Sequence, residues 1–284
     1  NVYGIAYAGK SEGVDFLLRQ IKKINKRTGA AYSPVFKILR AADYGVPQIR
    51  ERFFLVAERE GKQFKFPPPT HGQAGDARQL ALAAFPAYRT AWDALGDLAD
   101  DPSDELRARG RWAELLPSIP EGQNYNWHTD RGGGRPLFGW RRRYWNFLLK
   151  LAKNQPSWTI QAQPGPAVGP FHWNSRRLSM REMARLQTFP DDVTILGNLG
   201  AVQRQLGNAV PSLLAEVLAR AIRQQLLGRR AAAGAPRLLP PLRTPVPMPE
   251  PVHAIAHHYL DLLGEHTAHP GTGRGYGAEQ RAEA

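Results

Sequence analysis

A long stretch of irregular sequence, residues 70 to 176, constrains the fold of this chain more than any other feature. It is rich in Gly, Pro, Trp and Arg and has few long periodic segments. Apolar residues at helix or strand spacing occur on both sides of it. The sequence therefore predicts a loop-dominated domain inserted between two ordered parts of an α/β protein.

The part before this stretch is predicted to contain a helix and two strands. Residues 35–40 and 52–57 are β-branched and aromatic runs typical of strands, separated by a turn at residues 43–47. Residues 14–27 carry aliphatic residues at helical spacing, with Gly29 just past the end: Val14, Leu17, Leu18, Ile21 and Ile24. This order indicates the edge of an α/β sheet.

The part after the stretch is predicted to be helical at first. Ser179 and Glu182 fit a capping box, and a second helix is expected from about Pro211 to Gly228. Its buried stripe would consist of Leu214, Val217, Leu218, Ala221 and Ile222. Residues 229–252 are rich in Ala, Pro and Arg and are expected to form a linker, followed by a short helix at 253–263.

Charge and composition narrow the function classes. Lys and Arg number 38 against 25 Asp and Glu, giving a net charge of +13, which favours a nucleic-acid partner. An Arg-rich source proteome would explain the charge equally well. The 284 residues contain no cysteine, which excludes disulfides, thiolate zinc sites and a cysteine nucleophile among them, and we expect no metal site. Because neither a membrane-length apolar run nor a secretory signal is present, a cytoplasmic protein is expected.

Gln48, Arg50 and Arg52 stand at alternate positions at the entry to the second predicted strand. In extended chain such side chains project to the same side, so two guanidinium groups and an amide would cluster. That cluster suits phosphate oxygens or base-edge acceptors. A solvated strand edge with salt bridges to Glu51 or Glu58 fits the same residues, so the pattern alone leaves both interpretations open.

Three stretches together resemble the DNA (cytosine-5)-methyltransferase family. Residues 42–52, Ala-Asp-Tyr-Gly-Val-Pro-Gln-Ile-Arg-Glu-Arg, match its eighth motif, whose core is Gln-x-Arg-x-Arg. Residues 177–191 match the ninth motif, and residues 205–211, Gln-Leu-Gly-Asn-Ala-Val-Pro, match the tenth. Asn1-Val2 is similar to the end of the family's Glu-Asn-Val motif. The resemblance covers residues 1 to about 228.

The resemblance implies part of a Rossmann-like, S-adenosylmethionine-dependent methyltransferase sheet with an inserted, irregular target-recognition domain. Residues 1–69 and 177–228 would belong to the catalytic domain, and residues 70–176 would be the recognition domain. Residues 229–284 would be a Pro-rich linker and tail. The implied partner is double-stranded DNA, and restriction-modification is the biological setting expected from the family.

Roles follow by matching motif positions. In the family, the second Arg of the eighth motif reaches the flipped cytosine, which assigns that role to Arg52. Arg50 is then expected to act beside it, toward phosphate or the catalytic loop, and Gln48 to contact DNA. Asn1 falls in the catalytic Glu-Asn-Val motif. The ninth motif is explained by capping and core packing, and we assign no catalytic residue there.

The tenth motif is expected to complete the S-adenosylmethionine pocket, with contacts from Asn208 and Ala209. These residues are predicted to lie just before the helix at Pro211, where free N–H groups and the positive dipole end suit a carboxylate. A plain helix cap is the alternative interpretation.

The insert contains two candidate DNA-contacting stretches. Residues 131–143 interleave arginines with aromatic residues and glycines, which suits a loop that follows DNA; the candidates are Arg131, Arg135 and Arg141. Residues 158–161 resemble the Thr-Leu/Ile element of family recognition domains, so Thr159 and Gln161 are candidates for reading a base edge. Residues 145–149 are predicted to form a buried helix.

The family's chemistry also needs residues that this sequence lacks. It needs a cysteine thiolate from a Pro-Cys motif, a Glu that would directly precede Asn1, and a Phe-x-Gly-x-Gly loop for the cofactor. We therefore expect the chain to be inactive alone and to need an upstream segment or partner subunit that carries them. The missing initial Met and the cut inside Glu-Asn-Val favour truncation over a natural split.

Two other functions stay open from the sequence. The chain could be a stand-alone sequence-specific DNA-binding module or remnant, which the net charge of +13 supports. It could also belong to an RNA-directed branch of the family, although the long Arg-rich insert favours DNA.

Overall fold

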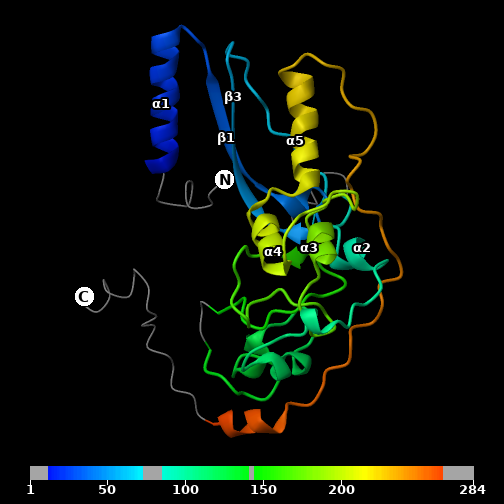
Figure 1. Ribbon diagram of the computed structural model, residues 1–284. Coiled ribbons are helices and arrows are strands. Elements are labelled where there is room, and N and C mark those ends of the chain that lie inside the picture. The colour runs from blue at the N-terminus through cyan, green and yellow to red at the C-terminus, as the bar shows by residue number, and fades with distance from the viewer. Residues whose placement is uncertain (1–11, 73–84, 141–143, 265–284) are drawn as a thin grey trace, which may run out of the picture. The chain divides into compact units, whose positions relative to one another are not determined.

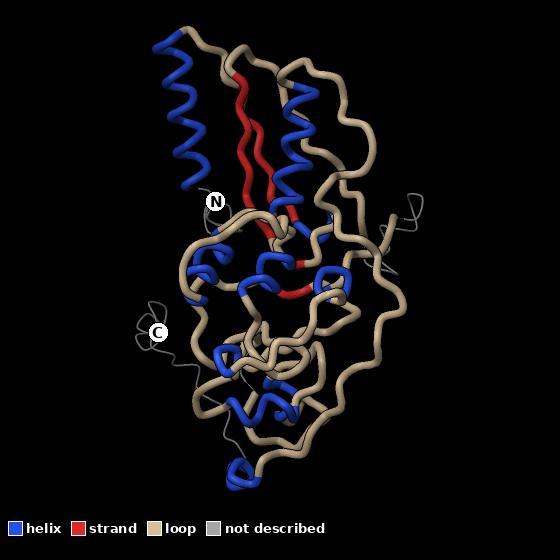
Figure 2. The backbone as a smooth tube through the Cα atoms, turned by 45° about the vertical axis from the view of Figure 1, so that its right-hand side comes forward, coloured by secondary structure: helices blue, strands red, loops and turns tan. Residues whose placement is uncertain are grey.

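The computed structural model describes residues 12–72, 85–140 and 144–264 (Figures 1 and 2). The chain divides into two compact units, each made of separate segments. Unit 1 contains the described residues of 1–99, 154–162 and 180–245, and unit 2 contains those of 100–153, 163–179 and 246–284. No helix within the described ranges is long and apolar enough to cross a membrane.

Unit 1 begins with a helix and a β-hairpin. Helix α1 (Glu12–Thr28) has acidic residues in its first turn and basic residues in its last, as the helix dipole favours, and Gly29 follows it at φ 69°. Strands β1 (Ser33–Arg40) and β3 (Glu51–Glu58) pair antiparallel with Ser33 opposite Glu58. These elements confirm the predicted helix and strands, and with them the mixed α/β class.

The connection between the two long strands positions the site described below. A short 3-10 helix, η2 (Ala41–Tyr44), follows β1 and ends at Gly45 with φ 87°. Strand β2 (Gln48–Ile49) then pairs in parallel with β4 (Ser157–Trp158), which comes from a distant part of the chain. Residues 154–162, inside the insert expected from the sequence, therefore pack within unit 1.

The helices of unit 1 are α2 (Ala91–Leu95), α3 (Met180–Leu186), α4 (Leu199–Asn208) and α5 (Ser212–Gln225). Helix α2 starts with a capping box between Thr90 and Asp93, and α4 starts at Asn198, whose side chain accepts the N–H of Ala201 at 2.9 Å. The sequence predicted α3 and α5 but not α2 or α4.

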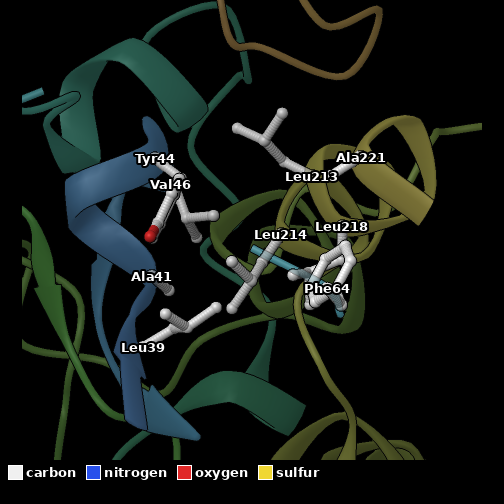
Figure 3. Packing of buried hydrophobic residues seen from close by; sticks show 9 residues of the cluster. All are labelled: Leu39, Ala41, Tyr44, Val46, Phe64, Leu213, Leu214, Leu218 and Ala221. Carbon is white, nitrogen blue, oxygen red and sulfur yellow. The ribbon is translucent and has the colours of Figure 1, made fainter. Parts of the chain in front are cut away.

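The core of unit 1 lies between the hairpin and α5 (Figure 3). Leu39, Tyr44 and Val46 meet Leu214 and neighbouring residues of α5 there, and Phe64 lies beside them. Leu214 and Leu218, predicted for the buried stripe, are both buried. The burial of these aliphatic side chains stabilises the attachment of α5 to the hairpin, since each one removed from water contributes about 1.5–3 kcal/mol.

Unit 2 is built from loops and short 3-10 helices, namely η3 (Asp104–Leu106), η4 (Ala113–Ser118), η5 (Tyr125–His128) and η6 (His257–Leu262). Its core combines buried leucines with aromatic residues, and Trp112, Tyr125, Phe138 and Phe147 pack mostly edge to face, their ring centroids about 5–6 Å apart. The loop-dominated character predicted for this part of the chain is what the structure shows.

The buried helix predicted at residues 145–149 is wrong. This segment forms turns and isolated bridges, Phe147 to Val168 and Lys150 to Phe171. Leu148 has φ 54°, a left-handed conformation that no helix interior contains. Leu148 and Leu149 are nevertheless buried, so the apolar residues of this segment indicated burial correctly but did not indicate a helix.

The segment from residue 246 packs onto unit 2. Tyr259 of η6 is buried, stacks on Trp112 with ring centroids 5.8 Å apart, and donates from its hydroxyl to the carbonyl oxygen of Arg111 at 2.6 Å. Upstream, Nζ of buried Lys153 lies 2.6 Å from Glu121 and 2.8 Å from Glu250. We call residues 246–264 the strap, because they tie the end of the described chain to the core of unit 2.

Candidate functional site

The motif residues of unit 1 meet at one buried point, where β2, β4, the end of α3 and the end of α4 come together. Pairing between β2 and β4 places Gln48 opposite Ser157 and Ile49 opposite Trp158. The N–H of Ser157 donates to Pro47 at 2.9 Å, and the hydroxyl of Thr159 donates to Ile49 at 2.7 Å. Strand β2, in the eighth motif, is thereby held to β4 and Thr159, which come from a distant part of the chain.

Gln48 is fully buried and faces this junction. Its amide nitrogen donates to the carbonyl oxygen of Leu186, and its amide oxygen accepts the N–H of Ile160, both at 3.4 Å. The sequence expectation was that this side chain contacts DNA. In the structure both polar atoms of the Gln48 side chain form hydrogen bonds inside the protein. Strand β2 is short and enclosed, so it does not present a row of side chains to solvent.

Arg50 is also buried, at 1% exposure. Its guanidinium donates to three main-chain carbonyl oxygens, those of Ile160 at 3.1 Å, Gly207, and Ala209 at 3.0 Å. Its Nε is buried without a partner. A planar fork of donors satisfies several carbonyls at once, so Arg50 joins the segment after β4 to the tenth motif rather than facing a phosphate.

Arg52 is the one arginine of this motif that is only partly buried. Its guanidinium donates to the carbonyl oxygens of Glu51 at 2.8 Å and Gly207 at 3.3 Å, and its Nε is buried without a partner. Burial lowers the pKa of Arg52 to about 10, so the group stays protonated at neutral pH. The positively charged guanidinium of Arg52 thus lies beside the tenth motif, with its Nε donor unpaired.

Gly207 is placed where only glycine fits. A Cβ added there would come within 2.3 Å of Cα of Ala162 and 2.7 Å of the carbonyl carbon of Gln161. Gln187, at the end of α3, donates from its amide to the carbonyl oxygen of the adjacent Leu206. The backbone of the tenth motif is therefore pressed directly against the segment that follows β4.

The tenth motif runs from the last turn of α4 to Pro211, the N-cap of α5, so it precedes that helix as the sequence predicted. Asn208 is the last residue of α4, and the N–H of Ala209 donates back to Gln205 at 3.0 Å. The first N–H groups of α5 are occupied as well, since Ser212 donates to Gln187 at 3.0 Å and Leu213 to the Thr188 hydroxyl at 2.8 Å. These two N–H groups are therefore engaged within the protein, and a carboxylate contact at this helix start stays a prediction.

Asn208 itself is exposed, and its amide makes no hydrogen bond within the described ranges. Ala209 is partly buried, with its N–H and its carbonyl oxygen both engaged. Of the two residues expected to contact the cofactor, Asn208 alone retains free polar atoms.

The other predicted site residues fall in different places. Gln161 is partly buried in unit 1, and its amide has no partner in the described part of the chain, whereas the Thr159 hydroxyl donates to Ile49. Arg131 and Arg135 are exposed on unit 2. Asn1 and Arg141 lie outside the described residues.

The ninth motif carries a network of ion pairs rather than a free basic face. Arg185 reaches Asp191 at 2.5 Å and Asp97 at 3.1 Å, and Arg181 reaches Asp191 at 2.7 Å. Side-chain hydrogen bonds from Arg185 and Arg181 lower the pKa of Asp191. These contacts link α3 to the end of α2 and agree with a structural role for the motif.

Comparison with known proteins places these residues in context. Residues 1–224 match the family described as C-5 cytosine-specific DNA methylase. The type II methyltransferase M.SacI of Streptomyces achromogenes is 44% identical over 237 residues, which are 80% of this chain and 59% of that protein. The type II methyltransferase M.NgoFVII of Neisseria gonorrhoeae is 31% identical over 227 residues, 78% of this chain and 56% of that protein.

Among solved structures, that of the S. pombe Dnmt2 methyltransferase aligns with a TM-score of 0.46 at 14% identity, over 74% of this chain and 63% of that chain. The chain spans a little more than half the length of the two curated relatives.

Proposed function

Because the chain belongs to the C-5 cytosine-specific DNA methylase family, we propose that it supplies the DNA-recognition and cytosine-contacting part of a DNA (cytosine-5)-methyltransferase. The reaction would transfer a methyl group from S-adenosylmethionine to C5 of a cytosine turned out of the duplex. The type II names of the relatives support a restriction-modification setting.

The observation that carries this proposal is the position of Arg52. Its guanidinium is fixed against Gly207, is partly exposed, and is protonated at neutral pH. Such a group can donate to the carbonyl oxygen of a cytosine ring and favour negative charge that develops there during attack at C6. Arg52 is therefore the proposed cytosine contact.

Gln48 and Arg50 would act as positioning residues. Their side chains bind the backbone near Ile160 and Gly207, so they fix the surface on which Arg52 rests. Gln161, which follows the same segment and has a free amide, stays a candidate for DNA contact together with Arg131, Arg135 and Thr159.

The nucleophile must come from outside these 284 residues, since they contain no cysteine. We propose that a segment or subunit with Pro-Cys and Phe-x-Gly-x-Gly motifs provides the thiolate that attacks C6 and most of the cofactor pocket. S-adenosylmethionine, which the family uses, supplies the methyl group. From this chain, the free amide of Asn208 fits a polar contact to it, whereas Ala209 could offer its methyl group alone.

The test is to join this chain to the part of M.SacI that it does not match, and to measure transfer of labelled methyl groups to random-sequence duplex DNA. The fusion should methylate cytosine C5, and this chain alone should not. Arg52→Ala should lower the methylation rate by roughly a hundredfold or more, as loss of one transition-state donor does, whereas Arg59→Ala, at an exposed position, should not.

No transfer by a folded fusion would overturn the enzyme proposal. Sequence-specific DNA binding by this chain without any transfer would instead favour a stand-alone DNA-binding module. Transfer to tRNA in preference to duplex DNA would place the chain in an RNA-directed branch.

A further inference from the structure

An arginine and a tryptophan are stacked on the surface of unit 2. Cζ of Arg131 lies 3.8 Å from the centre of the Trp140 ring. Both side chains are exposed, Trp140 at 37%. The Arg131 guanidinium makes no hydrogen bond or ion pair within the described ranges, so the donors along its edges are available.

The turn beneath this pair is rigid. A Cβ at Gly132 would lie within 2.2 Å of the carbonyl oxygen of Asn126, and Cβ atoms at Gly133 or Gly134 would lie within 2.6 Å of the Trp127 ring. The glycines are therefore packed against Trp127 and do not form a loose linker. The fixed turn determines where Arg131 emerges from the surface.

Hydrogen bonds hold the two ends of the same turn. The N–H of Arg131 donates to the Thr129 hydroxyl at 3.2 Å, and the N–H groups of Leu137 and Phe138 both donate to the carbonyl oxygen of His128. His128 is buried, and its ring bonds the Ser118 hydroxyl at 2.8 Å. The turn that carries the Arg131–Trp140 stack is thus anchored by hydrogen bonds to buried His128.

Stacking on an aromatic face fixes the plane of a guanidinium and leaves its edge donors free. A phosphate contact needs charge but not a fixed plane, because phosphate oxygens accept from many directions. A base edge with two coplanar acceptors does need it, and the one that matches the arginine fork is guanine, through O6 and N7 in the major groove. The immobilisation of Arg131 therefore favours base recognition.

We propose that Arg131 reads one guanine of the target sequence by a bidentate contact and that Trp140 is the positioning residue that fixes its plane. This inference rests on the proposed duplex DNA substrate, but not on methyl transfer. Arg135, which is exposed and has no aromatic partner among the described residues, is the matched comparison, and its proposed contact is to phosphate.

The test is a selection of bound sequences from a random duplex library by the 284-residue chain and, in parallel, by the fusion described above. Arg131→Lys, which keeps the charge but loses the fork, should reduce the preference for guanine at one position by roughly ten- to a hundredfold. Trp140→Ala should weaken the preference at that same position, and Trp140→Phe should restore it. Arg135→Ala should lower affinity evenly over all sequences and reduce the slope of log affinity against log salt by about one.

Three outcomes would overturn the inference. One is an Arg131→Lys variant with every base preference unchanged. Another is an Arg131→Ala variant that behaves like Arg135→Ala, which would make Arg131 a phosphate contact. A selection by chain and fusion that shows no guanine preference would also overturn it. Guanine selection without methyl transfer would instead retract the enzyme proposal and leave the role of Arg131 standing.

Discussion

Arg50 donates a hydrogen bond from its guanidinium to the main-chain carbonyl oxygen of Gly207, a residue 157 positions further along the chain. Arg52 donates to the same oxygen. The eighth and tenth motifs thus share this acceptor atom, and Arg50 adds a second bond to the carbonyl oxygen of Ala209.

Replacing Arg50 with Ala should strongly destabilise unit 1. The change leaves the carbonyl oxygens of Ile160 and Ala209 without their donor, and each buried polar group left unsatisfied costs about 1–3 kcal/mol. Urea unfolding of the whole chain measures the loss. Arg181→Ala breaks an exposed ion pair and should cost less than about 1 kcal/mol; equal losses for the two variants would show that the Arg50 bonds are not important.

Gly207 and Gly200 lie in the same helix, α4, and make a matched pair. Gly207→Ala forces a Cβ against the backbone of Ala162, so we expect a loss of about 1–3 kcal/mol or more. At Gly200 the nearest atom to an added Cβ is Oδ1 of Asn198 at 3.7 Å, so Ala should stabilise the helix by up to about 1 kcal/mol. Thermal melts that rank the two variants the other way would contradict the close approach.

Acid should destabilise unit 1 through His71. Burial, with Arg89 nearby, lowers the pKa of His71 from 6.5 to about 4. Between these values the unfolded chain binds more protons than the folded one, so the free energy of unfolding rises with pH there and levels off above about 6.5.

The His71→Gln variant isolates this effect. Relative to the variant, the wild type should lose up to about 3 kcal/mol of stability as the pH falls through that window. Urea unfolding at a series of pH values gives the difference, and His257→Gln, at an exposed position, is the control. Parallel curves for wild type and His71→Gln would refute the burial of a neutral ring.

Lys153→Met should destabilise unit 2 by about 3–5 kcal/mol, because it leaves the buried carboxylate of Glu121 without its partner. The double change Lys153→Met with Glu121→Gln should recover part of the loss. Glu250 is half exposed, so Glu250→Gln should cost about 1 kcal/mol or less. A double variant no more stable than Lys153→Met would show that the charge of Glu121 is not the cause.

Local periodicity predicted much of unit 1. The apolar spacing of residues 211–228 and the strand runs near residues 35 and 52 indicated faces that pack in the core of unit 1. The spacing of residues 14–27 indicated a helix correctly, although only Val14 of its apolar stripe is buried among the described residues. The sequence did not predict helix α4, because Gly200 and Gly207 both lower its helix propensity. Asn198, its N-cap, was the one signal in the sequence for the start of this helix. Glycine at position 207 is explained by the close approach of the Ala162 backbone.

The sequence predicted which residues form the candidate site, but not which way their side chains face. Alternation placed Gln48 and Arg50 on one side, yet nothing in the local pattern indicates which side faces the interior. That choice is made by β4 and by Ile160 just after it, more than a hundred positions away; the backbone of Ile160 accepts from Arg50 and donates to Gln48. The segment at Leu148 was likewise decided by non-local partners, since its backbone bonds Ala167 and its neighbour Phe147 bridges Val168.

The strap also bears on how sequence specificity can be inherited. Tyr259 belongs to the core of unit 2 and Glu250 pairs with the buried Lys153, although both lie beyond the residues matched to the family. A recombination event that exchanged only residues 100–179 between two relatives would part Lys153 from Glu250 and Trp112 from Tyr259. If unit 2 has the recognition role proposed above, a crossover that yields a folded hybrid would carry the strap together with residues 100–179, and a new specificity would need exchange at two separated places in the gene.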